Sequence, residues 1–262
     1  MTPIHEVLKA LDHLAPLHLA APWDNVGLLV EGTRDVSRIA CAIDCTPAVA
    51  AETLNEDVDL LISYHPPIFG GLKRLTHADP MARALISLIR SGVHVYSPHT
   101  ALDAVSGGVN DWLLEGFGPL TSSVPLEPSS ADPTTGHGRL AELSTPRSPE
   151  DTLAAIRTHL GLPALWWMEP VKGPTQIQTV AVCPGAGGSL LSELSGVDLV
   201  LTGEMRHHDQ LALAGRGTWV VTTGHTSTER GYLPRLVEHM RKAFPDTDIQ
   251  RSKADKTLLH WG

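Results

Sequence analysis

The sequence predicts an α/β protein built from two similar lobes with mixed, largely parallel sheets. Short β-branched runs alternate with windows of helical periodicity up to about Gly118, and a similar order of elements returns after residue 138. Alternation of this kind is typical of helices packed on a largely parallel sheet, because parallel strands need a crossover between them. With 262 residues the chain is long enough for two such lobes, each with its own core.

The first half begins with an amphipathic helix within residues 1–16, in which Ile4, Val7, Leu8, Leu11 and Leu14 recur at helical spacing. The expected strands are Arg38–Asp44, Val58–Ser63 and Val93–Ser97. The expected helices are Ala48–Glu56, Pro80–Arg90 and Val109–Glu115. Residues 120–138 are rich in Pro, Ser, Thr and Gly without periodicity, which predicts a connection.

The second half repeats the pattern. The expected strands are Arg139–Leu143, Leu165–Met168, Thr179–Cys183, Leu199–Thr202 and Thr218–Thr223, with a helix at Pro149–Leu160 and another from about Ser227. We therefore predict a first lobe of residues 1–119 plus 225–262 and a second lobe of residues 120–224.

The composition indicates a globular protein of the cytoplasm. No apolar run approaches the roughly 20 residues of a membrane helix, and the amphipathic amino terminus resembles neither a signal peptide nor a presequence. The chain has three cysteines, Cys41, Cys45 and Cys183. They are too few, and odd in number, for a disulfide framework, which favours a reducing compartment. The formal net charge of −9 gives no support for general nucleic-acid binding, although a local basic patch stays an open alternative.

A histidine and a carboxylate lie four residues apart at His225 and Glu229, just after the strand 218–223. With a helix starting near Ser227, both side chains face the crevice at the carboxyl end of the sheet, where α/β proteins hold ligands. Imidazole and carboxylate together suit a divalent cation. The alternative is that Glu229 only complements the helix dipole and that His225 is an ordinary loop histidine.

Two other strand ends carry groups of the same kind. His65 follows a buried strand, and the two prolines after it fix the direction of its ring. His99 and Asp103 follow the strand 93–97. Asp103 could ligate a metal while His99 holds or protonates a group nearby. Taken alone, His65 could hydrogen-bond a loop, Asp103 could cap a helix and His99 could face solvent.

Ligand-type side chains on three separate strand-end loops are hard to explain by helix capping. Titratable groups that converge in such a crevice are typical of active sites. The set His65, Asp103, His225 and Glu229 therefore predicts a metal site in the cleft between the two lobes.

Two further segments carry polar or glycine-rich turns after strands. Residues 182–189 form a strand, a glycine-rich turn and a helix start, which suits a tight turn and, as an alternative, an anion cradle. His207 and His208 are adjacent on a helix and point about 100° apart, so they cannot easily bind one ion together. We expect one of them, His208, to contact substrate or relay protons, and the other to lie on the surface.

Five ordered motifs together carry a family resemblance. They are Trp23-Asp24-Asn25-Val26-Gly27-Leu28; Ile62-Ser63-Tyr64-His65-Pro66-Pro67-Ile68-Phe69; His99-Thr100-Ala101-Leu102-Asp103; Thr202-Gly203-Glu204-Met205 with His207-His208; and His225 through Glu229-Arg230-Gly231. The chain resembles the GTP cyclohydrolase I type 2 family, also called NIF-three-like proteins, from its first helix to its last.

The resemblance implies two α/β lobes, a toroidal homohexamer and one or two divalent cations per subunit. It implies His65, Asp103, His225 and Glu229 as ligands, with Glu229 as the bridge between two ions. Tyr64 occupies the first position of a His-His pair in that family, and a neutral phenol is a poorer ligand than imidazole. Mixed nitrogen and oxygen ligands are compatible with Zn, Mn, Fe, Co, Ni or Mg.

Two functions follow as hypotheses. The first is a metal-dependent hydrolase that activates water against a nucleotide or phosphoester substrate, with His99 or His208 relaying protons. The family name suggests opening of the GTP purine ring, and phosphoester hydrolysis is an equally physical use of the same metals. The alternative is a metal-stabilised hexameric ring that acts as a binding or scaffold protein with no or vestigial catalysis.

Overall fold

A computed structural model describes residues 1–257. Its contacts divide the chain into two compact units, each described by itself below. Of the described residues, the first unit holds 1–102 and 232–257, and the second holds 103–231. The mixed α/β class is confirmed. The two units change over at 102/103 and 231/232, whereas the predicted lobe boundaries lie at 119/120 and 224/225. Residues 258–262 of the predicted first lobe lie outside the described chain.

The first unit holds a five-stranded sheet in the order β1-β4-β3-β2-β13. Its strands are β1 (Gly27–Val30), β2 (Arg38–Ala42), β3 (Leu60–Ser63), β4 (His94–Ser97) and β13 (Asp248–Arg251). β1 pairs antiparallel with β4, and the other neighbours are parallel. Its helices are α1 (Ile4–Leu14), the 3-10 turn η1 (Leu17–Leu19), α2 (Pro47–Asn55), α3 (Pro80–Arg90) and α9 (Leu233–Ala243), and α4 (His99–Ala104) crosses into the second unit.

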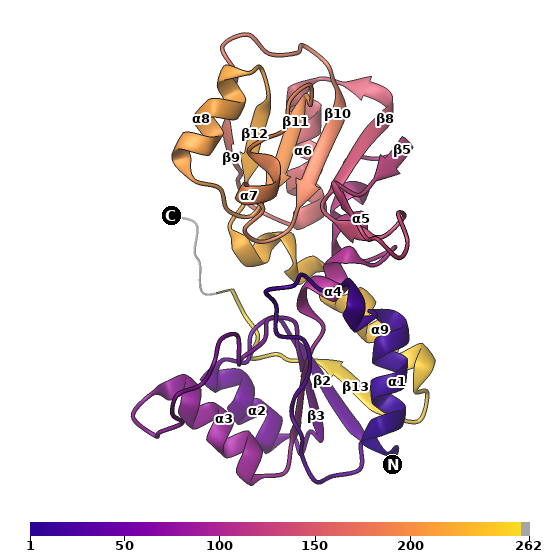
Figure 1. Cartoon of the computed structure of the whole chain (residues 1–262), viewed down its shortest axis with the longest axis vertical. Helices are drawn as coiled ribbons and strands as arrows, with labels where there is room; N and C mark the ends of the chain where they lie inside the picture. Colours follow the sequence, from indigo (N-terminus) through magenta and orange to yellow (C-terminus); the bar gives the residue numbers. More distant parts are fainter. Residues whose placement is uncertain (258–262) are drawn as a thin grey trace. The chain divides into compact units, whose positions relative to one another are not determined.

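Helices cover both faces of this sheet, with α2 and α3 on one side and α1 and α9 on the other (Figure 1). Ala40, Ala42 and Leu61 point into a core with Leu85 and Leu88 of α3. Side chains of a strand alternate between the faces, so Ile39 and Cys41 of β2 belong to the opposite side, where α9 packs. Pro80 at the first turn and Asp79, whose carboxylate caps the helix, explain why α3 begins where the sequence predicts.

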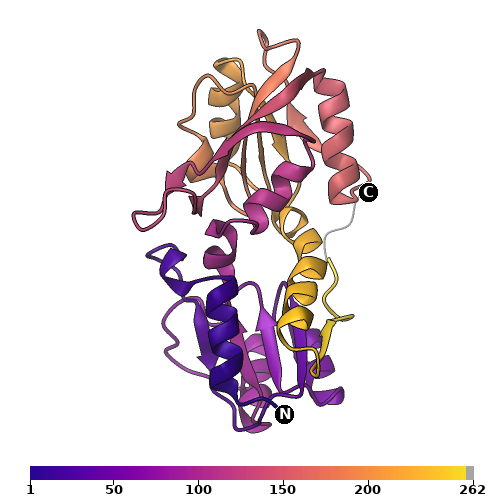
Figure 2. The ribbon, with the colours of Figure 1, turned by 90° about the vertical axis from the view of Figure 1, so that its right-hand side faces the viewer.

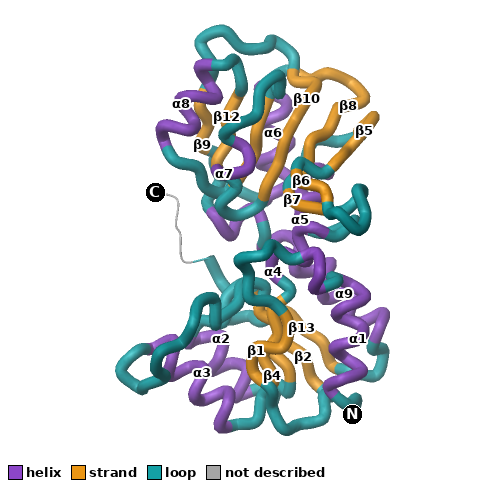
Figure 3. Tube along the Cα trace, in the orientation of Figure 1, coloured by secondary structure: helices purple, strands orange, loops and turns teal. Residues whose placement is uncertain are grey.

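The second unit holds a six-stranded mixed sheet in the order β5-β8-β10-β11-β12-β9. Its strands are β5 (Leu120–Val124), β8 (Arg139–Arg147), β9 (Trp166–Met168), β10 (Ile177–Cys183), β11 (Leu199–Thr202) and β12 (Trp219–Thr222). β10, β11 and β12 are parallel, and the other neighbours are antiparallel. The short strands β6 (Glu127–Pro128) and β7 (Gly136–His137) form a separate ribbon (Figure 3).

The helices of the second unit are α5 (Val109–Glu115), α6 (Pro149–Leu160), α7 (Gly188–Leu191) and α8 (His207–Gly215), with 3-10 turns η2 (His225–Thr228) and η3 (Arg230–Tyr232), the latter crossing into the first unit. α6 and α8 lie on opposite sides of the sheet (Figure 2). Leu191 of α7 and Leu213 of α8 pack with Val200 and Val220 of the sheet. No helix among residues 1–257 combines the length and the hydropathy needed to cross a membrane.

Two expectations about the elements are wrong. Residues 120–138 are not a plain connection, because they contain β5 and the β6–β7 ribbon. β5 lies at the edge of its sheet, and four of its five residues are exposed, so it carries no apolar period. The helix expected from about Ser227 starts only at Leu233, and Glu229 ends a 3-10 turn instead of opening an α-helix.

We expect Asp59→Asn to lower the free energy of unfolding by about 2 kcal/mol, because the carboxylate holds the start of β2 through charged hydrogen bonds. Asp59 accepts from the Ser37 N–H at 2.9 Å, the Ser37 hydroxyl at 2.8 Å and the Arg38 N–H at 3.0 Å. Burial raises the pKa of Asp59, but these bonds and the Arg34 charge outweigh it and hold the pKa below its ordinary value.

The stabilisation from Asp59 is therefore fully present above about pH 4 and is lost as the pH falls through the lowered pKa of the folded state. Urea unfolding of the wild type and of Asp59→Asn between neutral and acidic pH measures this loss of stabilisation. A difference between wild type and Asp59→Asn that stays constant into strong acid would contradict the assignment.

Candidate metal centre

His225 and Glu229 converge within the second unit. Gly224, at φ 83°, ends the strand β12 and turns the chain into η2, which begins at His225. His225 Nε2 lies 3.4 Å from Glu229 Oε1, and the Glu229 side chain is only 3% exposed. Two ligand atoms about 2.1 Å from one tetrahedral ion lie about 3.4 Å apart, so the spacing fits two ligands of one cation.

The glycine-rich turn after β10 closes around this pair. Gly185 has φ +59°, and a Cβ there would lie 2.7 Å from Glu229 Oε1 and 2.8 Å from His225 Nε2. The Gly185 N–H donates to the hydroxyl of Thr228 at 2.8 Å, which ties the turn to η2. The segment is thus a tight strand-to-helix turn, and its missing side chain leaves the ligand atoms room for an ion.

A second carboxylate orients His225. Glu204, exposed after β11, places Oε2 3.1 Å from His225 Nδ1. A carboxylate on one ring nitrogen fixes the tautomer and leaves the other nitrogen to bind metal, as in carboxylate–histidine–metal triads. The ring nitrogen of His225 that faces Glu229 is therefore Nε2.

Asp103 belongs to the same unit, and its charge acts on the thiol of Cys183. Burial raises the pKa of the Cys183 thiol, and the negative charges of Asp103 and Glu229 raise it further. Both effects favour the neutral thiol form of Cys183. The Asn110 side chain donates to the backbone carbonyl of Asp103 at 2.9 Å and holds the end of α4 in place.

His65 lies in the first unit, directly after β3. Its Nδ1 lies 2.9 Å from Asp44 Oδ1, and this contact orients the ring. The Ser63 hydroxyl donates to the His65 carbonyl at 2.8 Å and holds the backbone of the turn. Asp44 holds the ring of the same residue.

His99 has a buried carboxylate partner of its own. Its Nδ1 lies 2.7 Å from Asp24 Oδ1, and the Asp24 side chain is fully buried. Burial alone would raise the pKa of Asp24, but hydrogen bonds with His99 and Thr100 outweigh it and hold the pKa below its ordinary value. The backbone of His99 is held at φ 28°, an uncommon conformation for this residue. His99 is therefore a positioned histidine.

The rings of Tyr64, His65 and His99 form one cluster in the first unit. Their centroids lie 5.0 Å apart for Tyr64 and His65, 5.6 Å for Tyr64 and His99, and 5.4 Å for the two histidines. Tyr64 is only 2% exposed and packs edge-on against His99. The role of Tyr64 as a metal ligand stays a prediction.

His208 lies in the second unit, on the exposed start of α8. Its ring centroid lies 5.7 Å from that of His207. Its predicted catalytic role stays a prediction. The sequence reasoning missed the three orienting carboxylates Asp24, Asp44 and Glu204. Asp24 and Glu204 lie inside two of the five motifs, and Asp44 is the last residue of the predicted strand Arg38–Asp44, which is the signal that could have found them.

Ligand groups suited to a divalent cation are thus present in both units. Within the second unit, His225 and Glu229 bring an imidazole and a buried carboxylate together. Within the first unit, His65 offers a further imidazole. Imidazole and carboxylate are the mixed donors found in catalytic metal sites.

Comparison with known proteins gives the family. A profile of the family Duf34/NIF3 (NGG1p interacting factor 3) matches residues 2–257. The chain belongs to the Duf34/NIF3 family. The Protein NIF3 homolog of Schizosaccharomyces pombe is 38% identical to this member over 96% of the chain and 95% of the relative. The predicted family resemblance is confirmed.

Other family members are similar over most of their length. The NGG1-interacting factor 3 of Saccharomyces cerevisiae is 35% identical over 82% of each chain. A Bacillus cereus protein related to NIF3 has the same fold, with a TM-score of 0.85, 17% identity and 98% coverage of each chain. Reduced HcgD from Methanocaldococcus jannaschii likewise shares the fold, with a TM-score of 0.81 and 24% identity over 96% of this chain and 98% of that one.

Proposed function

We propose that this family member is a metal-dependent hydrolase that activates water against a nucleotide or phosphoester. The observation that supports this most is the convergence of His225 Nε2 and Glu229 Oε1 at 3.4 Å beneath a glycine that leaves them room. Burying a carboxylate costs free energy, and packing alone does not offset that cost. A histidine beside it that is oriented by a second carboxylate therefore favours a ligand site.

The proposed ligands of one or two divalent cations are His65, Asp103, His225 and Glu229, with Tyr64 as a weaker fifth. Glu229 is the proposed bridge. The mixed nitrogen and oxygen donors are compatible with Zn, Mn, Fe, Co, Ni or Mg.

A bound cation would supply Lewis acidity and lower the pKa of water at the site. The residues of the chain supply the rest of the proposed chemistry. His225, held by Glu204, keeps its ring in one orientation. His99, held by buried Asp24, presents Nε2 as a group that accepts or donates a proton at the substrate.

Replacing Asp24 with asparagine should lower turnover by about 100-fold while leaving metal content unchanged, because His99 loses the carboxylate that fixes its tautomer. Steady-state kinetics and elemental analysis of the same preparation check this. Asp44→Asn is the matched comparison, because it removes the same kind of bond from a proposed metal ligand and should lower metal content instead. Equal effects of the two variants on metal content would contradict the separation of roles.

The proposed activity is tested with metal-loaded protein on a panel of nucleotides and phosphodiesters. The expected result is metal-dependent release of product by wild type and none by His225→Ala. Equal turnover by the two proteins, on every substrate of the panel, would contradict a hydrolase that uses this centre.

The second candidate function is a metal-stabilised homohexameric ring that acts as a binding or scaffold protein. The name of the Saccharomyces cerevisiae relative, NGG1-interacting factor 3, favours an interacting protein. Light scattering with and without chelator distinguishes the two candidates. A hexamer that dissociates when metal is removed, together with no turnover on the panel, would favour the scaffold.

A further inference from the structure

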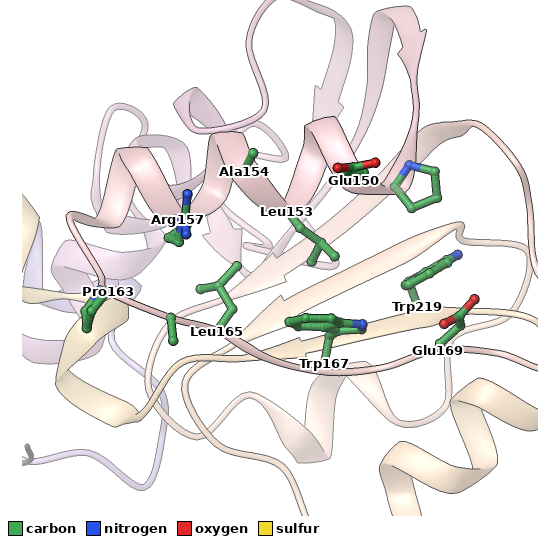
Figure 4. A pocket seen from close by; sticks show the side chains of 11 residues that line it. Glu150, Leu153, Ala154, Arg157, Pro163, Leu165, Trp167, Glu169 and Trp219 are labelled. Carbon is green, nitrogen blue, oxygen red and sulfur yellow. The ribbon is translucent and has the colours of Figure 1, made fainter. Parts of the chain in front are cut away.

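A pocket of about 650 Å³ lies in the second unit between α6 and the strands β9 and β12 (Figure 4). Its charged lining side chains, Glu150, Arg157 and Glu169, are all exposed. A site needs side chains that packing and hydrogen bonds hold in place, so these three define no particular ligand. The residues that follow β13 in the first unit are the opposite case.

Residues 252–257 follow β13 (Figure 1) and are tied to α2 through one carboxylate, that of Glu52. Glu52 accepts from the N–H groups of Lys253 and Ala254 at 3.0 and 3.1 Å, and from the hydroxyl of Ser252. Burial raises the pKa of Glu52, but these hydrogen bonds and the Lys253 charge outweigh it and hold the pKa below its ordinary value. The segment is therefore fixed on the first unit.

Asp255 of this segment reaches the end of β2. Its Oδ2 accepts from the N–H of Ile43 at 2.9 Å, and its own N–H donates to the hydroxyl of Ser252 at 3.2 Å. Ile43 is fully buried and is the first residue after β2. The carbonyl of Ile43 accepts from the N–H of His65 at 2.9 Å. Ile43 is thus held by Asp255 on one side and by His65 on the other.

Asp44, the next residue along the chain, holds the ring of His65. Its Oδ1 lies 2.9 Å from His65 Nδ1. An ionised carboxylate only accepts, so this contact favours the tautomer with its proton on Nδ1. The Asp44 side chain is 40% exposed, so packing does not fix its direction. That direction depends on the backbone, which the bonds of Ile43 hold.

We propose that Asp255 is a positioning residue for His65 and acts on its ring through Ile43 and Asp44. A carboxylate that holds a peptide N–H forms a strong, charge-assisted hydrogen bond. Without it, the peptide before Asp44 is free to turn, and the Asp44 carboxylate leaves Nδ1. The expected effect on metal binding rests on the proposed function, whereas the expected effect on the ring of His65 does not.

Asp255→Ala tests the proposal in two measurements on the full chain. The first is the ¹⁵N NMR spectrum of the His65 ring, without metal and at about pH 8, where an ordinary histidine is neutral. The fraction of rings with the proton on Nε2 rises at least about threefold, because the carboxylate that favours Nδ1–H is lost. The second is calorimetric titration with Zn²⁺, in which the affinity falls about fivefold.

Asp248→Ala is the matched control. Asp248 is a carboxylate on the preceding strand β13, and it also holds β2, through Arg38 Nε at 2.8 Å. Arg38 is the first residue of β2, so this contact lies at the opposite end of the strand from Ile43. The control leaves the ring spectrum of His65 and the Zn²⁺ affinity unchanged. Circular dichroism and thermal unfolding confirm that each variant is folded.

A double-mutant cycle separates positioning from a general role in stability. If Asp255 acts through Asp44, then Asp255→Ala changes the ring spectrum and the Zn²⁺ affinity by less than about 1.5-fold when Asp44→Ala is already present. If Asp255→Ala does not fold, Asp255→Asn takes its place. Its amide oxygen still accepts from the Ile43 N–H, but without the charge, so the Nε2–H fraction rises about twofold.

The proposal is overturned if the folded Asp255 variant shows the ring spectrum of wild type. It is equally overturned if the effect is as large in the Asp44→Ala protein as in wild type, or if Asp248→Ala changes the ring as much. A wild type that binds no Zn²⁺ contradicts the proposed function instead, and the ring spectrum then decides the role of Asp255.

Discussion

Glu229→Gln should lower both the metal affinity and any metal-dependent turnover by more than about 100-fold, because it replaces a buried charged ligand with a neutral amide of the same size. The Glu229 side chain is 3% exposed and lies against His225 Nε2. Burial is the main cause of the raised pKa of Cys183, and removing the negative charge of Glu229 takes away one of the smaller contributions. Isothermal titration with Zn²⁺ and Mn²⁺ measures the affinity, and the panel assay measures the turnover.

Glu204→Gln is the matched control for this prediction. Glu204 touches only the far side of the same histidine, through Nδ1, and is exposed. Orienting carboxylates of this kind contribute about 10-fold to 100-fold in metal affinity or activity, so the expected loss is at the lower end of that range. If Glu204→Gln lowers affinity as much as Glu229→Gln does, then Glu229 is not a ligand.

Asp111→Ala should destabilise the second unit by about 3–5 kcal/mol, because it leaves the buried guanidinium of Arg139 without its carboxylate. The Arg139 side chain is 2% exposed, and its Nε lies 2.6 Å from Asp111 Oδ1. Its Nη1 donates to the carbonyls of Gly136 and Gly138 at 2.7 and 2.9 Å. These carbonyls satisfy the donors but do not neutralise the charge. Guanidinium chloride unfolding followed by tryptophan fluorescence measures the loss.

Glu238→Ala provides the comparison, because it removes one partner of an exposed pair with Lys242 on α9. Exposed pairs of this kind contribute little, so its unfolding midpoint should match that of wild type. Equal midpoints for Asp111→Ala and Glu238→Ala would show that the buried position of Arg139 carries no special energetic role.

The local signals of the sequence predict much of the fold. Pro80, Pro149 and the residues before them define the starts of α3 and α6, and both helices match their predicted bounds. The strands β1 and β13 were not predicted. Each is four residues long, and β13 (Asp248–Arg251) carries charged ends, so its place beside β2 depends on pairing with a partner some 200 residues away.

The candidate site divides in the same way. Side chains that follow buried strands, such as His65 and His225, are visible in the sequence as breaks in an apolar run. Which carboxylate orients which histidine is not visible, because 75 residues separate Asp24 from His99 and 21 separate Glu204 from His225. The predicted helix start at Ser227 failed for a related reason. The Thr228 hydroxyl accepts from the Gly185 N–H and donates to the His225 carbonyl. These bonds favour a 3-10 turn there.

The metal content of the full chain, purified without added metal and measured by elemental analysis, tests the central claim most directly. The double variant His225→Ala/Glu229→Ala, shown to be folded by circular dichroism, is measured beside it. We predict one or two divalent ions per wild-type chain and less than about one tenth of that in the double variant. Equal metal content in the two proteins, or no metal in wild type even after incubation with Zn²⁺ and Mn²⁺, would contradict the account.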